Sequence, residues 1–172
     1  MSTTALQFAT LATFVVAFFL ASMGEYWTHR LMHLRKVLAE VHREHHKKNT
    51  GQGVLGELID YYRGGIPGLL VFAVPLWLFV APPTGVAFLA GGLCYGAFAA
   101  YAHQLQHENP GKCFWMKMPV HYVHHKYNMW HHNFGIGVDI WDRAFGTYKV
   151  AEWQTSEERA APARGMLHVK WV

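Results

Sequence analysis

Charged side chains are scarce in this chain, and long stretches lack them entirely. They make up 15% of the 172 residues, whereas about a quarter is usual in soluble globular proteins. No Lys or Arg precedes Arg30, and the stretch from Gly64 to His107 contains no Asp, Glu, Lys or Arg. Uncharged stretches of this length argue against a water-soluble domain and indicate segments that cross a lipid bilayer.

Two further absences exclude two other classes of protein. Cys94 and Cys113 are the only cysteines and form no C-x-x-C motif, so a disulfide framework is not expected. The net charge of +4 would suit a nucleic-acid partner, but the basic residues do not gather on one face. Seven of the 15 Lys and Arg lie between Arg30 and Arg63, and eight lie between Lys112 and Lys170. This distribution is typical of membrane topology, and we expect no nucleic-acid binding.

The uncharged stretches predict about three transmembrane helices. Residues 5–23 are 19 uncharged residues, close to the roughly 20 that cross a hydrocarbon core of about 30 Å as a helix. No basic segment precedes them, as one would in a cleaved signal peptide. The turn sequence Pro82-Pro83-Thr84-Gly85 divides the second stretch, which predicts a helical hairpin over residues 66–81 and 86–102. The glycine-rich residues 50–67 are expected to be a connecting segment.

These helices would place all Lys and Arg on one side of the bilayer, which the positive-inside rule makes the cytoplasmic side. On that side we expect a helical cap, formed by about residues 29–50 and 103–150. The expected fold is therefore an all-α integral-membrane helical bundle with a cytosolic cap. Residues 1–172 are expected to form a single multi-pass membrane domain, with its active site facing the cytoplasm.

Histidine is the residue in excess, with 13 in the chain. Ten of them form four motifs, because an H-x-x-x-H is twice followed by an H-x-x-H-H. In chain order they are His29 and His33; His42, His45 and His46; His103 and His107; and His121, His124 and His125. Polar helices are expected over residues 34–48 and 114–130, and each carries one H-x-x-H-H. Residues three or four apart in a helix lie near one another, so we expect the three histidines of the first H-x-x-H-H to point one way.

The four motifs predict a metal centre at the membrane surface. Imidazole is a good ligand for iron, zinc, copper and nickel, and a loosely binding histidine tract would cluster in one place rather than at the ends of separate helices. Ten candidate ligands exceed the three or four of a single zinc site and suit two metals. A two-metal site can bind an oxygen-derived group, and an iron pair can supply electrons for O–O cleavage. A cytoplasm-facing site above apolar helices suits a lipid substrate.

The four motifs, the hairpin between them, and Asn133-Phe134-Gly135 followed by Trp141-Asp142-Arg143-Ala144-Phe145-Gly146-Thr147 resemble the fatty acid hydroxylase/sterol desaturase superfamily of integral-membrane di-iron enzymes. The resemblance covers about His29 to Tyr148. It implies two non-haem iron ions, although zinc can occupy such a site in purified protein, with O2 as co-substrate and a membrane lipid as substrate. It implies a separate electron donor, of the ferredoxin or cytochrome b5 type. It also implies that the metal ligands are His29, His33, His42, His45, His46, His103, His107, His121, His124 and His125.

Further residues near the motifs are candidates for orienting the ligands by hydrogen bonds. They are Asn128, His131, His132, Asn133 and Asp139. His131 and His132 can equally be occasional ligands or interfacial residues, and turn capping is the alternative for Asp139. For Asp142 we favour turn capping. Glu25 and Glu108 adjoin the motifs, and each is either a carboxylate behind a ligand or a solvated charge at a helix end.

The favoured function is O2-dependent hydroxylation of an aliphatic C–H bond in a membrane lipid, of the fatty acyl, sterol-like or a related class. Desaturation and carotenoid ring hydroxylation on the same site are alternatives. A divalent-metal transporter or metal-binding membrane protein is a non-enzyme alternative, but it needs polar ligands within the bilayer, which residues 66–81 and 86–102 almost lack. A haem-binding electron carrier would need histidines that face each other within the helices, whereas these histidines lie at the helix ends. His42-Arg43-Glu44-His45 has the wrong order and spacing for a metalloprotease motif.

Overall fold

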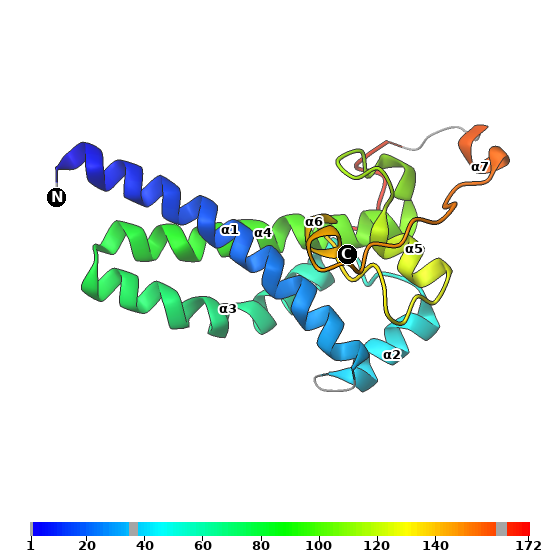
Figure 1. The fold of residues 1–172 in the computed structure, drawn as a ribbon, viewed down its shortest axis with the longest axis horizontal. Helices are drawn as coiled ribbons and strands as arrows, with labels where there is room; N and C mark the ends of the chain where they lie inside the picture. Colours follow the sequence, from blue (N-terminus) through cyan, green and yellow to red (C-terminus); the bar gives the residue numbers. More distant parts are fainter. Residues whose placement is uncertain (1, 35–37, 161–164) are drawn as a thin grey trace.

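Three long helices form a stem, and the shorter elements gather at one end of it as a head (Figure 1). The computed structural model describes residues 2–34, 38–160 and 165–172. The stem helices are α1 (Thr3–His33), α3 (Val54–Phe79) and α4 (Pro82–Glu108). The head contains α2 (Ala39–Lys48), η1 (Pro110–Lys112), α5 (Val120–Lys126), α6 (Ile140–Ala144) and α7 (Ser156–Ala160). The described residues include no strand, so the predicted all-α class is confirmed.

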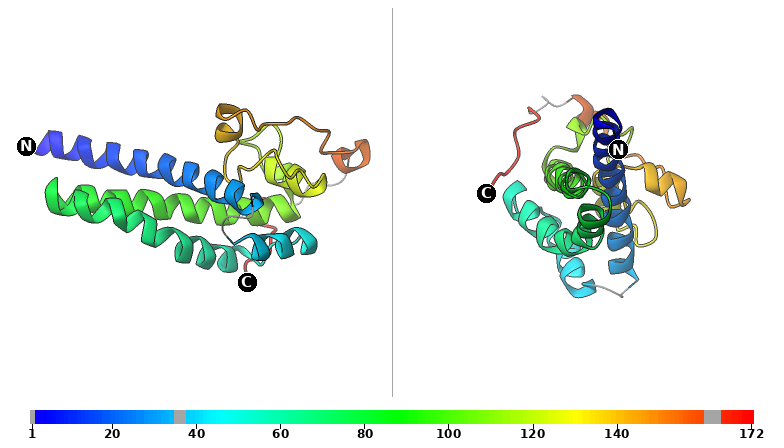
Figure 2. Two further views of the ribbon diagram at one scale, coloured as in Figure 1. Left: turned by 60° about the horizontal axis from the view of Figure 1, so that its bottom comes forward. Right: turned by 90° about the vertical axis from the view of Figure 1, so that its left-hand side faces the viewer.

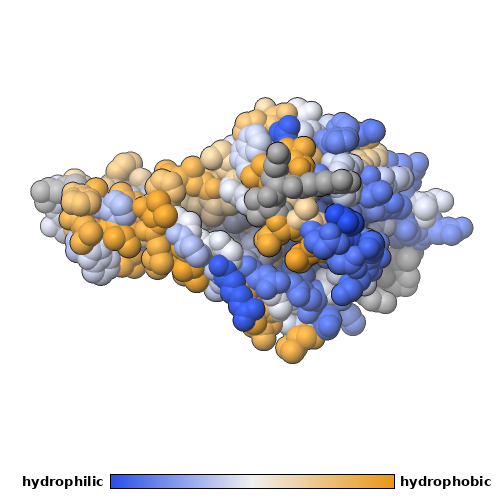
Figure 3. Space-filling view, turned by 90° about the horizontal axis from the view of Figure 1, so that it is seen from below, coloured by the Kyte–Doolittle hydropathy of each residue, from blue (hydrophilic) through white to orange (hydrophobic). Residues whose placement is uncertain are grey.

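All three stem helices are long and apolar enough to cross a membrane. Their outward side chains are apolar, as at Phe8, Val71 and Phe79, which are 74%, 66% and 84% exposed. A space-filling view shows the hydrophobic stem next to a hydrophilic head (Figure 3). Water would make such an exposed apolar surface unfavourable, whereas lipid does not. The structure thus supports the predicted membrane helical bundle.

Helix α4 is the central element of the stem, and it lies against both α1 and α3 (Figure 2). Small residues make this packing possible. A Cβ atom added to Gly91 would lie 2.2 Å from the carbonyl oxygen of Phe14, and one added to Gly85 would lie 2.6 Å from that of Ala73. Close approach of helix backbones is how helices associate in lipid, where no hydrophobic force draws them together. This packing aligns the head-side ends of α1 and α4.

Helix α4 begins at Pro82 and ends at Glu108, so the residues of the expected turn form its first turn and it extends beyond the expected 86–102 at both ends. Helix α1 likewise continues past residue 23 to His33.

The structure corrects three further expected boundaries. Helix α3 begins at Val54, so most of the expected connecting segment 50–67 is helical; a helix satisfies backbone hydrogen bonds internally, which the bilayer demands even of glycine-rich sequence. In the expected helix 114–130 only α5 is helical, since Pro119 disfavours helix before it and Asn128 has a left-handed φ of 48° after it. In the expected helix 34–48, α2 begins only at Ala39, and residues 35–37 lie outside the described residues.

Candidate metal centre

Four helices bring the ten motif histidines together in the head. The end of α1 carries His29 and His33, the end of α4 carries His103 and His107, and α2 and α5 carry three each. Nine of the ten fall into two groups. Within each group, one ring nitrogen of every histidine lies within 4.8 Å of those of the others, so that each group could hold a metal ion. The five-histidine group is His29, His33, His42, His46 and His124; the four-histidine group is His45, His107, His121 and His125.

His103 lies beside the four-histidine group. Its Nε2 atom is 3.2 Å from Nε2 of His45. Nine of the ten predicted ligand residues therefore belong to one of the two groups, and the tenth, His103, lies next to the four-histidine group.

Each group contains one histidine from the H-x-x-H-H motif whose other two histidines belong to the other group. His42 and His46 join the five-histidine group, whereas His45 between them joins the other; likewise His124 leaves its neighbours His121 and His125. The expectation that His42, His45 and His46 point one way is wrong. Successive residues of an α-helix are about 100° apart, so His45 and His46 face different groups.

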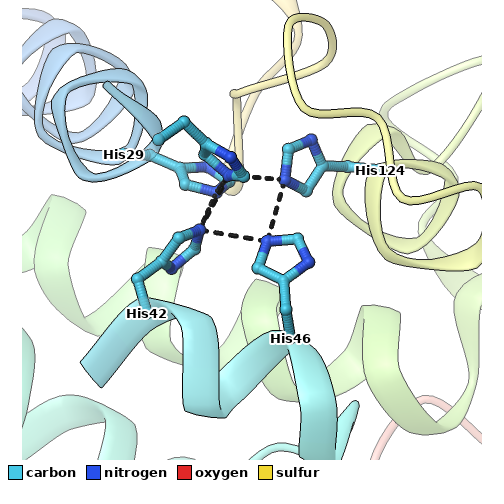
Figure 4. A group of neighbouring side chains, drawn as sticks. His29, His42, His46 and His124 are labelled. Carbon is cyan, nitrogen blue, oxygen red and sulfur yellow. Dashed lines mark hydrogen bonds between the residues drawn. The ribbon is translucent and has the colours of Figure 1, made fainter. Parts of the chain in front are cut away.

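The nitrogen spacing in the five-histidine group is that of donor atoms around one ion. Nε2 of His42 lies 2.8 Å from Nε2 of His33 and 3.0 Å from that of His46. Nε2 of His124 lies 2.9 Å and 3.1 Å from the same two atoms (Figure 4). Around a metal with bonds of about 2.0–2.1 Å to nitrogen, neighbouring nitrogens lie about 3.0 Å apart in an octahedron and about 3.4 Å apart in a tetrahedron. The residues therefore fit a bound metal.

The four-histidine group has slightly wider spacing and an unsatisfied histidine. Nε2 of His107 lies 3.3 Å from Nε2 of both His45 and His121. His125 is 9% exposed, and neither of its buried ring nitrogens has a hydrogen-bond partner among the described residues. Leaving a buried polar group unpaired costs about 1–3 kcal/mol, and a metal ion bound by one of these nitrogens would remove the cost at that atom. This group therefore fits a metal as well.

Electrostatics keeps the head histidines in the form that binds metals. Burial, with the neighbouring histidines, lowers the pKa of His42 to about 2 and that of His45 to about 3. Burial lowers the pKa of His46 to about 4. The pKa values of His121 and His124 lie well below the ordinary value of 6.5, chiefly through burial. These imidazoles are neutral at physiological pH, as metal ligation requires.

Backbone carbonyls orient two rings of the five-histidine group. Nδ1 of His29 lies 2.6 Å from the carbonyl oxygen of Phe134, and Nδ1 of His124 lies 2.8 Å from that of His132. A carbonyl only accepts hydrogen bonds, so each Nδ1 carries the hydrogen and each Nε2 faces the group with a free lone pair.

Asp142 holds the loop that supplies one of these carbonyls. This fully buried carboxylate accepts hydrogen bonds from the backbone N–H groups of Phe134 (2.8 Å) and Gly135 (2.7 Å) and from the Thr147 hydroxyl (2.7 Å). Asp142 caps a turn, as favoured from the sequence. The sequence did not reveal that the capped loop is the one that contacts His29.

Two glutamates, the half-buried Glu25 and the buried Glu57, lie close to the histidines or to the loop that contacts them. Glu25 accepts hydrogen bonds from the Ile136 N–H (2.7 Å) and the Tyr95 hydroxyl (2.6 Å), so it fastens the same loop to the stem. Glu57 lies with Oε2 2.8 Å from Nδ1 of His103. Sequence reasoning missed Glu57, because it fell in the expected connecting segment; an acidic residue at the start of an apolar helix was the available signal.

The five residues named as orienting candidates lie around the head. Asn133 is buried and bonds both backbone polar groups of Lys149 (2.9 Å and 2.8 Å). Asp139 pairs with Arg143 at 2.7 Å near the surface. His131 is exposed, His132 contacts His124 through its carbonyl, and Asn128 lines a cavity beside His46.

The family model described as fatty acid hydroxylase matches residues 14–147. This range includes all ten motif histidines, both glutamates and Asp142. No solved structure matches the chain.

Proposed function

The chain belongs to the fatty acid hydroxylase family, and from this premise we propose that it is an O2-dependent di-iron oxidoreductase that hydroxylates an aliphatic C–H bond of a membrane lipid. The observation that carries the proposal is the division of nine histidines into two groups, each with enough ring nitrogens for one metal. The groups are adjacent, since the rings of His46 and His125, one from each, stack with centroids 4.1 Å apart.

Each part of the chain has a role in this proposal. The histidines would hold the metals, and two iron ions bound there would supply the redox chemistry for activating O2. Asp142 and the carbonyl of Phe134 orient His29. Residues 1–172 would act as one membrane domain, with the three stem helices crossing the bilayer and the head in the cytoplasm.

The substrate and the reductant follow from the same arrangement. The apolar stem meets the head at the histidines, so a lipid in the bilayer would approach the centre with an aliphatic chain along the stem. O2-dependent hydroxylation also requires two electrons per turnover, which we assign to a separate protein of the ferredoxin or cytochrome b5 type. Its docking on the head would leave the stem free for lipid.

The test is metal content per chain after expression in iron-replete cells and gentle detergent extraction, with Mössbauer spectroscopy on an iron-57 sample. We expect two irons per chain that are spin-coupled after oxidation. Zinc found instead would call for iron reconstitution and a repeat. Weak, substoichiometric metal that iron cannot replace would contradict the proposal and favour a metal-binding or transport role.

Product formation provides the second half of the test. Membranes supplied with reductant and 18O2 should yield a lipid alcohol carrying the label, and His124→Ala should abolish it. His168→Ala is the matched control, since His168 is exposed and belongs to neither group. Label-free alkene would indicate desaturation, and full activity in His124→Ala would exclude the histidine centre as the site of reaction.

A further inference from the structure

We propose that Glu57 is a positioning residue for the four-histidine group, because its carboxylate holds Nδ1 of His103 and directs Nε2 of that ring to the metal position beside His45. The inference deepens the proposed function and rests on it. It makes His103 the fifth ligand residue of the second group, so each group would have five histidines.

The geometry of the His103 ring carries this inference. Nδ1 lies 2.8 Å from Oε2 of Glu57, which is an ion-pair contact without the angles of a regular hydrogen bond. Nε2 of the same ring lies 3.2 Å from Nε2 of His45. A neutral imidazole has one N–H donor and one lone pair, and a carboxylate only accepts. A lone pair on Nδ1 would be repelled by a carboxylate oxygen at 2.8 Å, so the contact favours the hydrogen on Nδ1 and the lone pair on Nε2, which faces the four-histidine group. This is the usual arrangement for a histidine that binds a metal.

Hydrogen bonds fix the position of Glu57 relative to α4. Its other carboxylate oxygen accepts a hydrogen bond from the backbone N–H of Gln52 at 3.0 Å. Gln104, the neighbour of His103 in α4, accepts one from the N–H of Gly53 at 2.8 Å. The start of α3 is thereby fixed to the helix that carries His103, so the contact is a built feature of the fold and not a chance meeting of mobile side chains.

The C-terminal segment forms backbone hydrogen bonds with the start of α3. The N–H of Val54 donates to the carbonyl of Lys170 at 3.0 Å, and that of Leu55 donates to Trp171 at 2.9 Å. These bonds use backbone groups at the first turn of α3, which a helix leaves unpaired. They fix the end of α3 from which Glu57 reaches His103.

The burial of Glu57 indicates a cation beyond the ring. The side chains of Glu57 and His103 are each 7% exposed, and within the described ranges no Lys or Arg pairs with Glu57. Burying a carboxylate is costly unless a positive charge compensates for it. A metal bound to Nε2 of His103 would supply that charge, with the imidazole transmitting the interaction.

The experiment compares Glu57→Gln with Asp60→Asn. Both remove one negative charge from α3 with little change in size, but Asp60 is exposed and bonds the Gln52 side chain instead of a histidine. The full chain in detergent is loaded with zinc, and the affinity of each metal is measured by competition with a chelator; iron-57 Mössbauer spectra are recorded in parallel. We expect Glu57→Gln to weaken one metal about 10- to 100-fold and change one iron signal. Asp60→Asn should change neither.

A double-mutant cycle separates positioning from a structural role. If Glu57 acts through His103, then Glu57→Gln should have no further effect on metal affinity in a His103→Ala background. Equal weakening of both metals, or a full effect of Glu57→Gln without His103, would mean that Glu57 only stabilises the fold and would overturn the inference. So would two unchanged metals in Glu57→Gln. If the unsubstituted chain itself holds no stoichiometric metal, the proposed function has failed instead.

Discussion

The five-histidine and four-histidine groups are built from similar motifs but supported differently. In the first, Nδ1 atoms of two rings meet backbone carbonyls of the loop after α5. In the second, His103 meets the buried carboxylate of Glu57 from the stem. A carbonyl is a neutral partner, whereas a carboxylate brings negative charge to within one ring of the metal. Two metal positions made from the same ligand type would therefore differ in electrostatics.

The exchange of His45 and His124 makes the two groups interdependent. Each group takes most of its ligands from one copy of the paired motifs and its remaining ligand from the centre of the other H-x-x-H-H. Neither copy can complete a group by itself. Both copies of the paired motifs are thus needed to form the two groups. For this reason α2 and α5 must meet, although 71 residues separate Lys48 from Val120.

The largest effect should come from removing one ligand in each group. His33→Ala is expected to lose the metal of the five-histidine group, because Nε2 of His33 lies within 3.3 Å of those of three other members. His107→Ala should lose the other metal. In each case we expect metal content to fall from two to one per chain and product formation to cease, since the proposed reaction needs both metals. Metal analysis and the membrane assay measure these outcomes.

Mössbauer spectra of the two variants sharpen this comparison. The remaining iron should give a different signal in each variant and show no spin coupling. Identical spectra would mean that the two groups do not hold distinct metals, and loss of both metals from either variant would mean that neither position is stable alone.

A smaller effect is expected from Asp142→Asn, which acts on the five-histidine group through the loop whose Phe134 carbonyl contacts His29. The amide nitrogen of asparagine cannot accept a hydrogen bond, so residue 142 loses at least one of the three hydrogen bonds that it accepts, two of which come from the loop that orients His29. We expect about 10- to 100-fold weaker binding of one metal and a loss of roughly 1–3 kcal/mol in stability. Chelator competition and thermal unfolding in detergent measure the two changes.

Asp139→Asn is the control for Asp142→Asn. Asp139 lies three residues away and pairs with Arg143 near the surface, where ion pairs contribute little. It should alter neither metal. The Asp142 prediction would be wrong if its substitution weakened the metal of the four-histidine group instead, because that group does not receive the Phe134 carbonyl.

The sequence predicted the class of fold because its signals are local. Uncharged stretches and turn residues mark the stem, and histidine spacing marks the ends of α1 and α4. The start of α3 was missed, because glycine-rich sequence resembles a linker unless the demand of the bilayer for satisfied backbone groups is applied to it. Because residues 50–67 were expected to be a connecting segment, Glu57 was not among the candidate site residues, and its partner His103 is 46 positions away along the chain.

The assignment of ligands to groups could not be read from spacing alone. His42 and His46 share a helix face, but where His45 points depends on how α2 meets α4 and α5. That contact is tertiary, and no spacing within one motif encodes it. Asp142 shows the same limit, since a turn cap is recognisable locally, whereas its effect on His29 depends on how the loop packs against α1.

The smallest predicted difference concerns Trp130, whose indole lies against two rings of the five-histidine group. Its indole lies edge-on to His33, with centroids 4.5 Å apart, and 6.0 Å from His46. It also lines a cavity of about 320 Å³ that reaches His46 and His125. Trp130→Ala should therefore open the five-histidine group to a chelator, while the metal of the four-histidine group keeps its rate of release.

The size of the Trp130 effect follows from the contact that is lost. An aromatic pair contributes about 0.5–1.5 kcal/mol, so release from the five-histidine group should be about 2- to 10-fold faster. Trp130→Phe keeps an aromatic ring against His33 and should release metal nearly as slowly as the unsubstituted chain. Time courses of chelator extraction distinguish the two metals if His107→Ala and His33→Ala provide the reference curves. Equal acceleration for both metals would show that the cavity, and not the indole, controls access, and the two groups would then share one entrance.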